Sequence, residues 1–401
     1  MRRLLVLVSA IVFLDAMLYG VLGPLVPVYT EAFDLSKGDA GLLVGSFGAG
    51  ALVGGIPGGL VAARLGPRRA VIIGLLLFAA GGFAFALADS ALLLGLARFV
   101  QGLSSAITWA GALSWIVVSA PRERRGELLG TAFGVAVFGA LLGPMFGGIA
   151  DALGPRPSFM VVGVIGLLLA AWATTGPELP PEPYERGAIG RVLREPRFVA
   201  GLWLNALPAA LFGVMTVLIP LSLDEHGFAP LAIGAIFLTA GLTESFVNPM
   251  IGRFSDRRGR LLPLRLALGG SIVTATGFAL FSSPVAIGVL VALAGVTYGA
   301  LYTPGMALTS DGAEHARLPQ GLAFGVMNSA WALGNLGGPS VGGALGGRAG
   351  DWLPYAISAA LCAVTLALLR TSPAGRPELP QLQPRRGRRG ARAPRGTRSR
   401  R

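Results

Sequence analysis

The chain has 401 residues, of which 53% are hydrophobic and only 13% charged, and its mean hydropathy is +0.67. Soluble domains carry about 25% charged residues, so this composition excludes an ordinary soluble protein and makes the lipid bilayer part of the solvent. The formal net charge is +13. Most of it lies in residues 371–401, which hold ten arginines and one acid, Glu378.

Apolar segments follow one another along nearly the whole chain. About 20 mostly apolar residues form a helix that crosses roughly 30 Å of hydrocarbon. Charged and turn residues divide the chain into twelve such segments, so we expect an all-α membrane protein. The predicted spans are 4–29, 39–63, 70–88, 91–118, 127–150, 157–175, 198–222, 230–252, 262–282, 285–309, 321–345 and 353–370.

Arginines alternate from loop to loop in step with these spans. They gather at residues 2–3, 64–69, 122–125, 186–197, 253–260 and 317 and in the tail, whereas the intervening loops hold mainly acids. Cytoplasmic loops of membrane proteins carry an excess of Lys and Arg. The pattern predicts an even number of spans, a cell inner (plasma) membrane location and both termini in the cytoplasm.

The two halves of the chain repeat each other. The glycines and proline at 130, 139, 143–144 and 147–148 recur at 325, 334, 338–339 and 342–343, an offset of 195. The loop from Gly59 to Gly66 recurs from Gly252 to Gly259, an offset of 193. Such duplicated halves are typical of alternating-access transporters. We expect two six-helix bundles, residues 1–176 and 198–370, a cytoplasmic linker at 177–197 and a disordered arginine-rich tail at 371–401.

Three motifs resemble those of a known family. The stretch 252–260, Gly-Arg-Phe-Ser-Asp-Arg-Arg-Gly-Arg, resembles the loop after the second helix of each half in the major facilitator superfamily. The stretch 98–102, Arg-Phe-Val-Gln-Gly, is similar to that family's fourth-helix motif. The glycines around Gly143-Pro144 match its fifth-helix motif. Within that family, this motif is associated with exporters.

The resemblance extends to one branch of that family. Leu14-Asp15-Ala16-Met17, followed by Pro24 and Pro27, is similar to the first helix of twelve-helix drug/proton antiporters. In the family, an aspartate in the loop motif latches the cytoplasmic side closed, a role that the resemblance gives to Asp256. Ala63 stands at the corresponding place in the first half, so we expect a weaker latch there.

Ionisable residues inside the spans are candidate sites, because a charge in hydrocarbon costs several kcal/mol unless it is paired or faces water. Asp15 lies about 11 residues from the inner end of its span, roughly 17 Å deep at 1.5 Å per residue. Arg98 lies at a similar estimated depth, so we predict an Asp15–Arg98 ion pair that protonation of Asp15 loosens. A static structural pair is the alternative. Glu244 is a second candidate for proton exchange or for binding a cation.

Polar and aromatic residues away from the span ends are candidates for lining a substrate cavity, although each also fits simple packing. They are Gln101, Thr108, Asn205, Tyr298, Asn328 and Trp331, with Trp109, Tyr302 and Asn335 as further possibilities.

Glycines spaced four apart share one helix face and allow close helix contact, which serves either a sliding contact or plain packing. The conformational-motif residues are Gly59, Gly66, Gly139, Gly143, Pro144, Gly147, Gly148, Gly252, Asp256, Gly259, Gly334, Gly338 and Pro339.

The sequence favours a secondary active transporter, monomeric and without cofactors, that exports small amphipathic or cationic molecules in exchange for protons. An uptake symporter or facilitator for a small metabolite is the alternative. The partners are the bilayer, the substrate and protons, and no nucleic acid. Because the single cysteine, Cys362, and two histidines cannot form a disulfide or a metal site, no metal is expected. A hydrolase is disfavoured although residues 338–342 read Gly-x-Ser-x-Gly.

Overall fold

A computed structural model shows a nearly all-helical protein and describes residues 1–121, 124–180, 187–258, 261–316, 318 and 320–371. Within these ranges the surroundings of residues 251–258 are not described. The arginine-rich tail predicted at 371–401 lies almost wholly outside the described residues.

The N-terminal half of the chain forms six long passages. They are α1 (Arg2–Gly20) continued by η1 (Gly23–Leu25) and α2 (Val26–Ala32), α3 (Lys37–Leu65), α4 (Pro67–Leu87), α5 (Ala91–Ser119), α6 (Arg125–Leu153) and α7 (Pro155–Thr174). A short helix, α8 (Ala188–Val192), precedes the C-terminal half.

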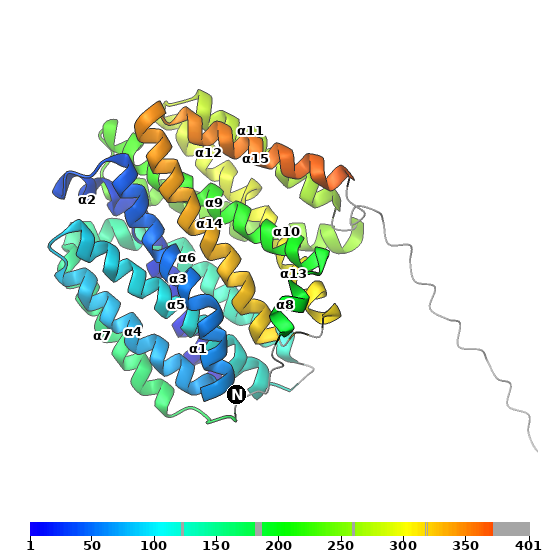
Figure 1. Cartoon of the computed structure of the whole chain (residues 1–401). Helices are drawn as coiled ribbons and strands as arrows, with labels where there is room; N and C mark the ends of the chain where they lie inside the picture. The colour runs from blue at the N-terminus through cyan, green and yellow to red at the C-terminus, as the bar shows by residue number, and fades with distance from the viewer. Residues whose placement is uncertain (122–123, 181–186, 259–260, 317, 319, 372–401) are drawn as a thin grey trace, which may run out of the picture.

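The C-terminal half repeats the arrangement. Its passages are α9 (Pro196–Glu225), α10 (Pro230–Arg258), α11 (Leu261–Leu280), α12 (Pro284–Thr297) continued by η3 (Gly299–Leu301) and α13 (Tyr302–His315), α14 (Gln320–Ala349) and α15 (Trp352–Thr371). We call the face with the N-terminus and the start of the linker at 175–180 the linker side, and the face with the turns at 33–36, 226–229 and 350–351 the far side (Figure 1).

Eleven helical segments of the described chain are long and apolar enough to cross a bilayer. The remaining long helix, α14, has 30 residues, and its glycines and the polar Asn328, Ser329 and Asn335 lower its hydropathy. It runs between α3 and α9 and packs against both (Figure 1). The all-α membrane fold is therefore confirmed, and the arrangement is consistent with twelve spans.

Local sequence explains where the helices begin and end. Ser36 accepts a hydrogen bond from the backbone N–H of Asp39 at 3.2 Å while the Asp39 carboxylate accepts from the Ser36 N–H, a capping box that starts α3. Gly66 adopts a φ of 86°, which favours glycine, and Pro67 then starts α4. Helices α7 and α9 also begin with a proline.

Two passages that the sequence analysis treated as continuous helices contain breaks. The predicted span 4–29 consists of α1, a 3-10 turn and α2, because Pro24 and Pro27 have no backbone N–H to donate. The predicted span 285–309 likewise contains the turn Gly299–Leu301. These breaks place backbone carbonyls inside the bundle that need donors from neighbouring helices.

Within each half, neighbouring helices pack against one another, and two helix pairs make most of the contact between the halves. In the first half α1 packs on α6, and α4 lies between α5 and α7. In the second half α9 packs on α13 and α14, and α11 packs on α15. Contacts of α3 with α14 and of α6 with α10 join the halves. The bounds predicted for the two bundles, the linker and the tail stay a prediction.

Candidate functional site

Asp15 lies buried where α1 meets α5. Its Oδ2 accepts a hydrogen bond from the hydroxyl of Ser105 and another from the indole Nε1 of Trp109, each at 2.7 Å. Both donors are neutral groups on the same helix, one turn apart. The carboxylate therefore links α1 to α5 through hydrogen bonds that a carboxylate charge strengthens.

Arg98 binds to the end of α1 instead of to Asp15. Its Nη1 donates to the carbonyl of Leu18 at 3.1 Å and to Oε1 of Gln101 at 2.9 Å, and its Nη2 donates to the carbonyl of Tyr19 at 3.3 Å. The last four carbonyls of a helix have no intrahelical donor, and a cation near that end is stabilised. Arg98 thus caps the C-terminus of α1.

Asp15 and Arg98 make no direct salt bridge among the ion pairs of the described residues, although each charge acts on the other, so their coupling during transport stays a prediction. Both are buried near the same helix contact, as the depth estimate predicted. The guanidinium is taken up by carbonyls that the break after Gly20 exposes, and its other face lies 4.8 Å from the ring centroid of Phe47.

Tyr19 links the two halves in the interior of the bundle, and the sequence reasoning missed it. Its hydroxyl donates to Oδ1 of Asn335 on α14 at 2.5 Å. Its ring lies 5.4 Å from the ring of Phe47 on α3 and 5.1 Å from that of Trp331 on α14. Asn335 is buried, and its Nδ2 has no hydrogen-bond partner within the described part of the chain. Two candidate cavity residues, Trp331 and Asn335, therefore lie directly at the contact between the halves.

Glu244 is partly buried on α10 and packs against the 3-10 turn that interrupts α12 and α13. Gly299 of that turn makes room for it, because the carboxyl carbon of Glu244 lies 2.8 Å from the place where a Cβ of residue 299 would stand. The Glu244 charge acts electrostatically on Tyr19 and on Tyr302. The second predicted carboxylate is thus near the cross-half aromatic contact.

The other predicted cavity residues divide between the two bundles. Gln101 is buried beside Arg98 and donates to the carbonyl of Gly81 at 3.3 Å. Thr108 is buried and faces Gly74 of α4. Asn205 donates to the carbonyl of Gly201 on its own helix at 2.8 Å, and the Tyr298 ring packs 5.5 Å from Phe212 in an edge contact.

These positions decide how much of the list forms one site. The printed contacts of Thr108 lie within the N-terminal half, and those of Asn205 and Tyr298 lie within the C-terminal half. Asn328 is partly buried on α14. A substrate-cavity role for these residues stays a prediction.

The glycine motifs form close helix contacts inside each half. Gly139, Gly143 and Gly147 lie against backbone carbonyls of Phe13, Met17 and Val21 on α1. The equivalent residues of the second half make equivalent contacts with α9: Gly334 lies against the carbonyl of Ala206, Gly338 against that of Ala210, and Gly342 against Val214. A side chain at these glycines would push the helices apart.

The remaining motif residues close the contact between the halves. Gly148 and Pro144 of α6 lie against Leu231 and Gly234 of α10, and Pro339 of α14 lies against Gly41 of α3. Gly59 is buried within α3. Gly252, Asp256 and Gly259 fall at residues whose surroundings lie outside the described part of the chain, so the latch role of Asp256 stays a prediction.

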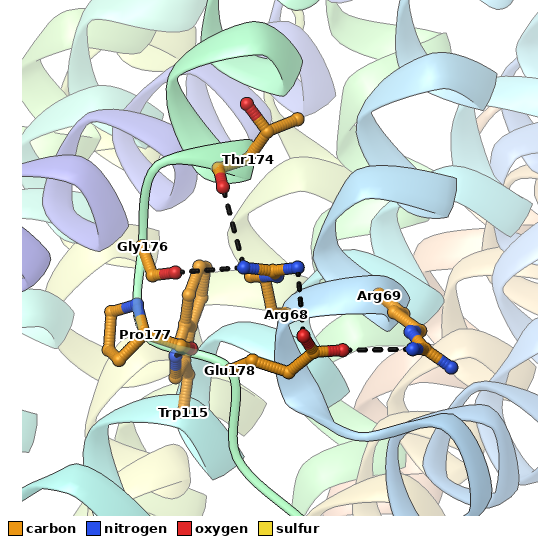
Figure 2. Close-up of polar contacts among 7 residues, drawn as sticks. All are labelled: Arg68, Arg69, Trp115, Thr174, Gly176, Pro177 and Glu178. Atoms are coloured by element: carbon orange, nitrogen blue, oxygen red, sulfur yellow. Dashed lines mark hydrogen bonds and ion pairs between the residues drawn. The ribbon is translucent and has the colours of Figure 1, made fainter.

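The first-half loop has a carboxylate after all, supplied by the linker. Arg68 Nη2 and Arg69 Nη2 contact the two carboxylate oxygens of Glu178 at 3.2 and 2.9 Å (Figure 2). Arg68 Nη1 also donates to the carbonyl of Gly176 at 3.1 Å, and Trp115 donates to that of Pro177 at 3.1 Å (Figure 2). These contacts fasten the beginning of the linker to the N-terminal half. A weaker first-half latch, expected from Ala63, stays a prediction.

The hydrolase-like pattern at 338–342 lies in the middle of α14. A serine-hydrolase nucleophile requires a sharp strand-to-helix turn, and Ser340 instead packs against Gly45 of α3. The pattern is a helix-packing motif in this protein.

Comparison with known proteins agrees with this architecture. A match to the Major Facilitator Superfamily spans residues 8–318. The chain is 27% identical over 384 residues to an uncharacterized MFS-type transporter, YcaD, of Shigella flexneri serotype 5b, which covers 92% of this chain and 95% of that protein. It is 30% identical over 157 residues to the quinolone resistance protein NorA of Staphylococcus aureus, which is 39% of this chain and only 40% of NorA.

Solved structures show the same fold at low sequence identity. The crystal structure of the nucleoside transporter NupG matches with a TM-score of 0.71 and 15% identity over 92% of this chain and 98% of NupG. A bacterial homologue of the human lysosomal transporter Spinster, in an inward-facing and occupied conformation, matches with a TM-score of 0.72 and 17% identity over 92% and 95% of the two chains. The chain therefore belongs to the Major Facilitator Superfamily, a family made of transporters.

Proposed function

We propose that this protein is a proton-coupled exporter of small amphipathic or cationic molecules that works by alternating access in the cell inner membrane. The observation that carries the proposal is the position of Asp15, a buried carboxylate held by two neutral donors, Ser105 and Trp109. A carboxylate in hydrocarbon is costly and marks ion pathways in transporters.

Protonation of Asp15 changes the contact between α1 and α5. The charged carboxylate accepts strong hydrogen bonds from the serine hydroxyl and the indole, and the neutral acid accepts weaker ones. Because α1 also carries Tyr19 to the cross-half contact, a change in α1 reaches Asn335 and Trp331 within about one helical turn. Proton binding at Asp15 thus biases the arrangement of the two halves.

Glu244 is the second carboxylate that supports the proposal. Its charge acts on the aromatic residues Tyr19 and Tyr302, and a carboxylate near aromatic rings favours a cation. The partial similarity to NorA, named for quinolone resistance, supports export of drug-like molecules. Both chain ends are proposed to lie in the cytoplasm, and the protein is proposed to act as a monomer.

An uptake symporter or facilitator remains the second candidate, because the fold is shared with a nucleoside transporter and fold does not fix substrate or direction. The direction of flux distinguishes the two. Exchange moves a substrate and protons in opposite directions, whereas symport moves them in the same direction.

The test uses purified protein in liposomes with an imposed pH gradient. We expect addition of the cationic dye ethidium to release protons through the wild type, and Asp15→Asn to abolish both dye and proton flux. Asp89→Asn is the matched control, since Asp89 is an exposed carboxylate in the α4–α5 turn. Dye accumulation by Asp15→Asn at the wild-type rate, or flux unaffected by collapse of the gradient, contradicts the coupling.

A further inference from the structure

The two halves are joined on the far side by an ionic contact that none of the sequence motifs predicts. Lys37, the first residue of α3, places its Nζ 3.0 and 3.1 Å from the two carboxylate oxygens of Asp351, in the turn between α14 and α15. The same Nζ lies 3.8 Å from Oε1 of Glu225, the last residue of α9. One lysine of the N-terminal half therefore contacts acids from two separate turns of the C-terminal half.

Backbone packing holds the partners of this contact in place. The first turn of α3 lies against the last turns of α14: Gly343 faces the carbonyl of Lys37, and Gly38 faces Ala344. Further along α3, a Cβ at Gly48 would lie 2.5 Å from the backbone nitrogen of Leu336. Because the helices approach this closely, the backbone of Lys37 stays beside the end of α14 while α3 and α14 remain packed.

The Lys37 contact is also partly shielded from water. The side chains of Lys37 and Asp351 are each 29% exposed, whereas that of Glu225 is 66% exposed. Exposed ion pairs contribute little, but a pair with both oxygens engaged and partners fixed by packing lies toward the favourable end of the range. Asp351 is thus the main partner, and Glu225 adds a weaker attraction.

The ion pairs on the linker side are different in kind. Glu178 binds Arg68 and Arg69, and all three belong to the N-terminal half and the start of the linker (Figure 2). That contact stiffens one half and leaves the distance between the halves unchanged. Lys37, in contrast, must separate from Asp351 whenever the far side opens.

We propose that Lys37 is a latch that holds the far side closed, and that its release from Asp351 and Glu225 is a required step in opening toward that side. The inference rests on the proposed alternating-access function. It assigns a conformational role to a charge cluster that lies outside the transport core. Without the lysine, the close contacts between the glycines of α3 and α14 remain, so the closed state persists at a lower population.

Spin-label distance measurements in lipid nanodiscs test the latch. Cys362 is the single cysteine, so Cys362→Ser gives a cysteine-free background. Labels at Asp89→Cys and Ser282→Cys, exposed positions in far-side turns of opposite halves, report separation away from the latch itself. We expect Lys37→Gln to raise the ratio of long to short distances about five-fold, the ratio equivalent to about 1 kcal/mol.

A charge exchange provides the specific control. Lys37→Asp places three acids together and should open the far side further, whereas Lys37→Asp combined with Asp351→Lys should restore the wild-type distances. Distances that are the same in wild type, Lys37→Gln and Lys37→Asp overturn the latch. Parallel flux measurements separate the two proposals: shifted distances without proton-coupled flux in the wild type retain the latch and reject the transport mechanism, and the reverse result rejects the latch alone.

Discussion

Two adjacent glycines of α14 allow a sharp test of the close packing in the C-terminal half. Gly338 lies against α9, where a Cβ would stand 2.7 Å from the Cα of Ala210, whereas a Cβ at Gly337 would meet no atom within 4 Å. Real Cβ atoms are essentially never so close to another backbone atom as Gly338→Ala would require. The helices must therefore separate or the substituted residue must strain.

The expected sizes follow from these surroundings. Gly337→Ala should stabilise the helix by up to about 1 kcal/mol through helix propensity. Gly338→Ala gains the same propensity but suffers overpacking, which costs about 1–3 kcal/mol. The two variants should therefore differ in the free energy of unfolding by up to about 3 kcal/mol, with Gly338→Ala the less stable.

Thermal unfolding in a single detergent, followed by circular dichroism and by tryptophan fluorescence, measures the difference. Comparison of the two variants cancels the intrinsic alanine effect, which is common to both. Equal transition temperatures for Gly337→Ala and Gly338→Ala would refute the contact between α14 and α9 at Ala210. A lower transition temperature for Gly337→Ala would refute the assignment of the two faces of α14.

Three further substitutions test other contacts. Tyr19→Phe should lose about 1 kcal/mol, because the buried amide of Asn335 loses its donor. Unfolding in denaturant measures the loss against Tyr355→Phe, which removes a buried hydroxyl that has no hydrogen-bond partner among the described residues. Arg98→Lys should lower the yield of folded protein on size-exclusion chromatography, since one ammonium cannot replace guanidinium bonds to two carbonyls and an amide; a normal elution profile and stability would contradict the capping role. Glu178→Gln should change stability by less than about 1 kcal/mol, as expected for a half-exposed ion pair, yet speed protease cleavage near residue 178. Unchanged cleavage would show that the bonds of Arg68 and Trp115 to the backbone carbonyls are enough to hold the start of the linker.

The helical architecture could be predicted from the sequence because long apolar segments and the charge of the loops are governed by the bilayer. The breaks in the first and tenth passages were not predicted, since hydropathy averages over a 3-10 turn of three residues. The prolines at 24 and 27 carried the signal for the first break. Gly299, which accommodates Glu244, carried the corresponding signal in the second half.

The candidate site could be predicted only in part. Depth along a helix is set by residue number, so the similar depths of Asp15 and Arg98 could be predicted from the sequence. The direction in which each side chain points depends on helix rotation and on the neighbours, and for this reason the bonds from Arg98 to the carbonyls of Leu18 and Tyr19 were not predicted. Tyr19 was missed because a tyrosine in an apolar segment is indistinguishable from a packing residue until α14 is placed beside it.

The linker shows a similar limit. Glu178 lies in a stretch rich in proline and charge, which predicts an exposed connection. Its pairing with Arg68 and Arg69 depends on the first turn of α4 lying beside the end of α7 on the linker side. The spacing of these residues in the sequence does not predict their pairing.

Because Arg98 caps the C-terminus of α1, the arginine of α5 and the break after α1 depend on each other. The guanidinium is tolerable in the interior because a helix stops there and offers its carbonyls. A substitution that made α1 continuous past Gly20 would give the carbonyls of Leu18 and Tyr19 intrahelical donors and leave the buried guanidinium of Arg98 with fewer partners. Changes at the break and changes at Arg98 should thus be harmful singly and acceptable together, so the kink in α1 and the arginine of α5 are expected to be lost or kept as a pair.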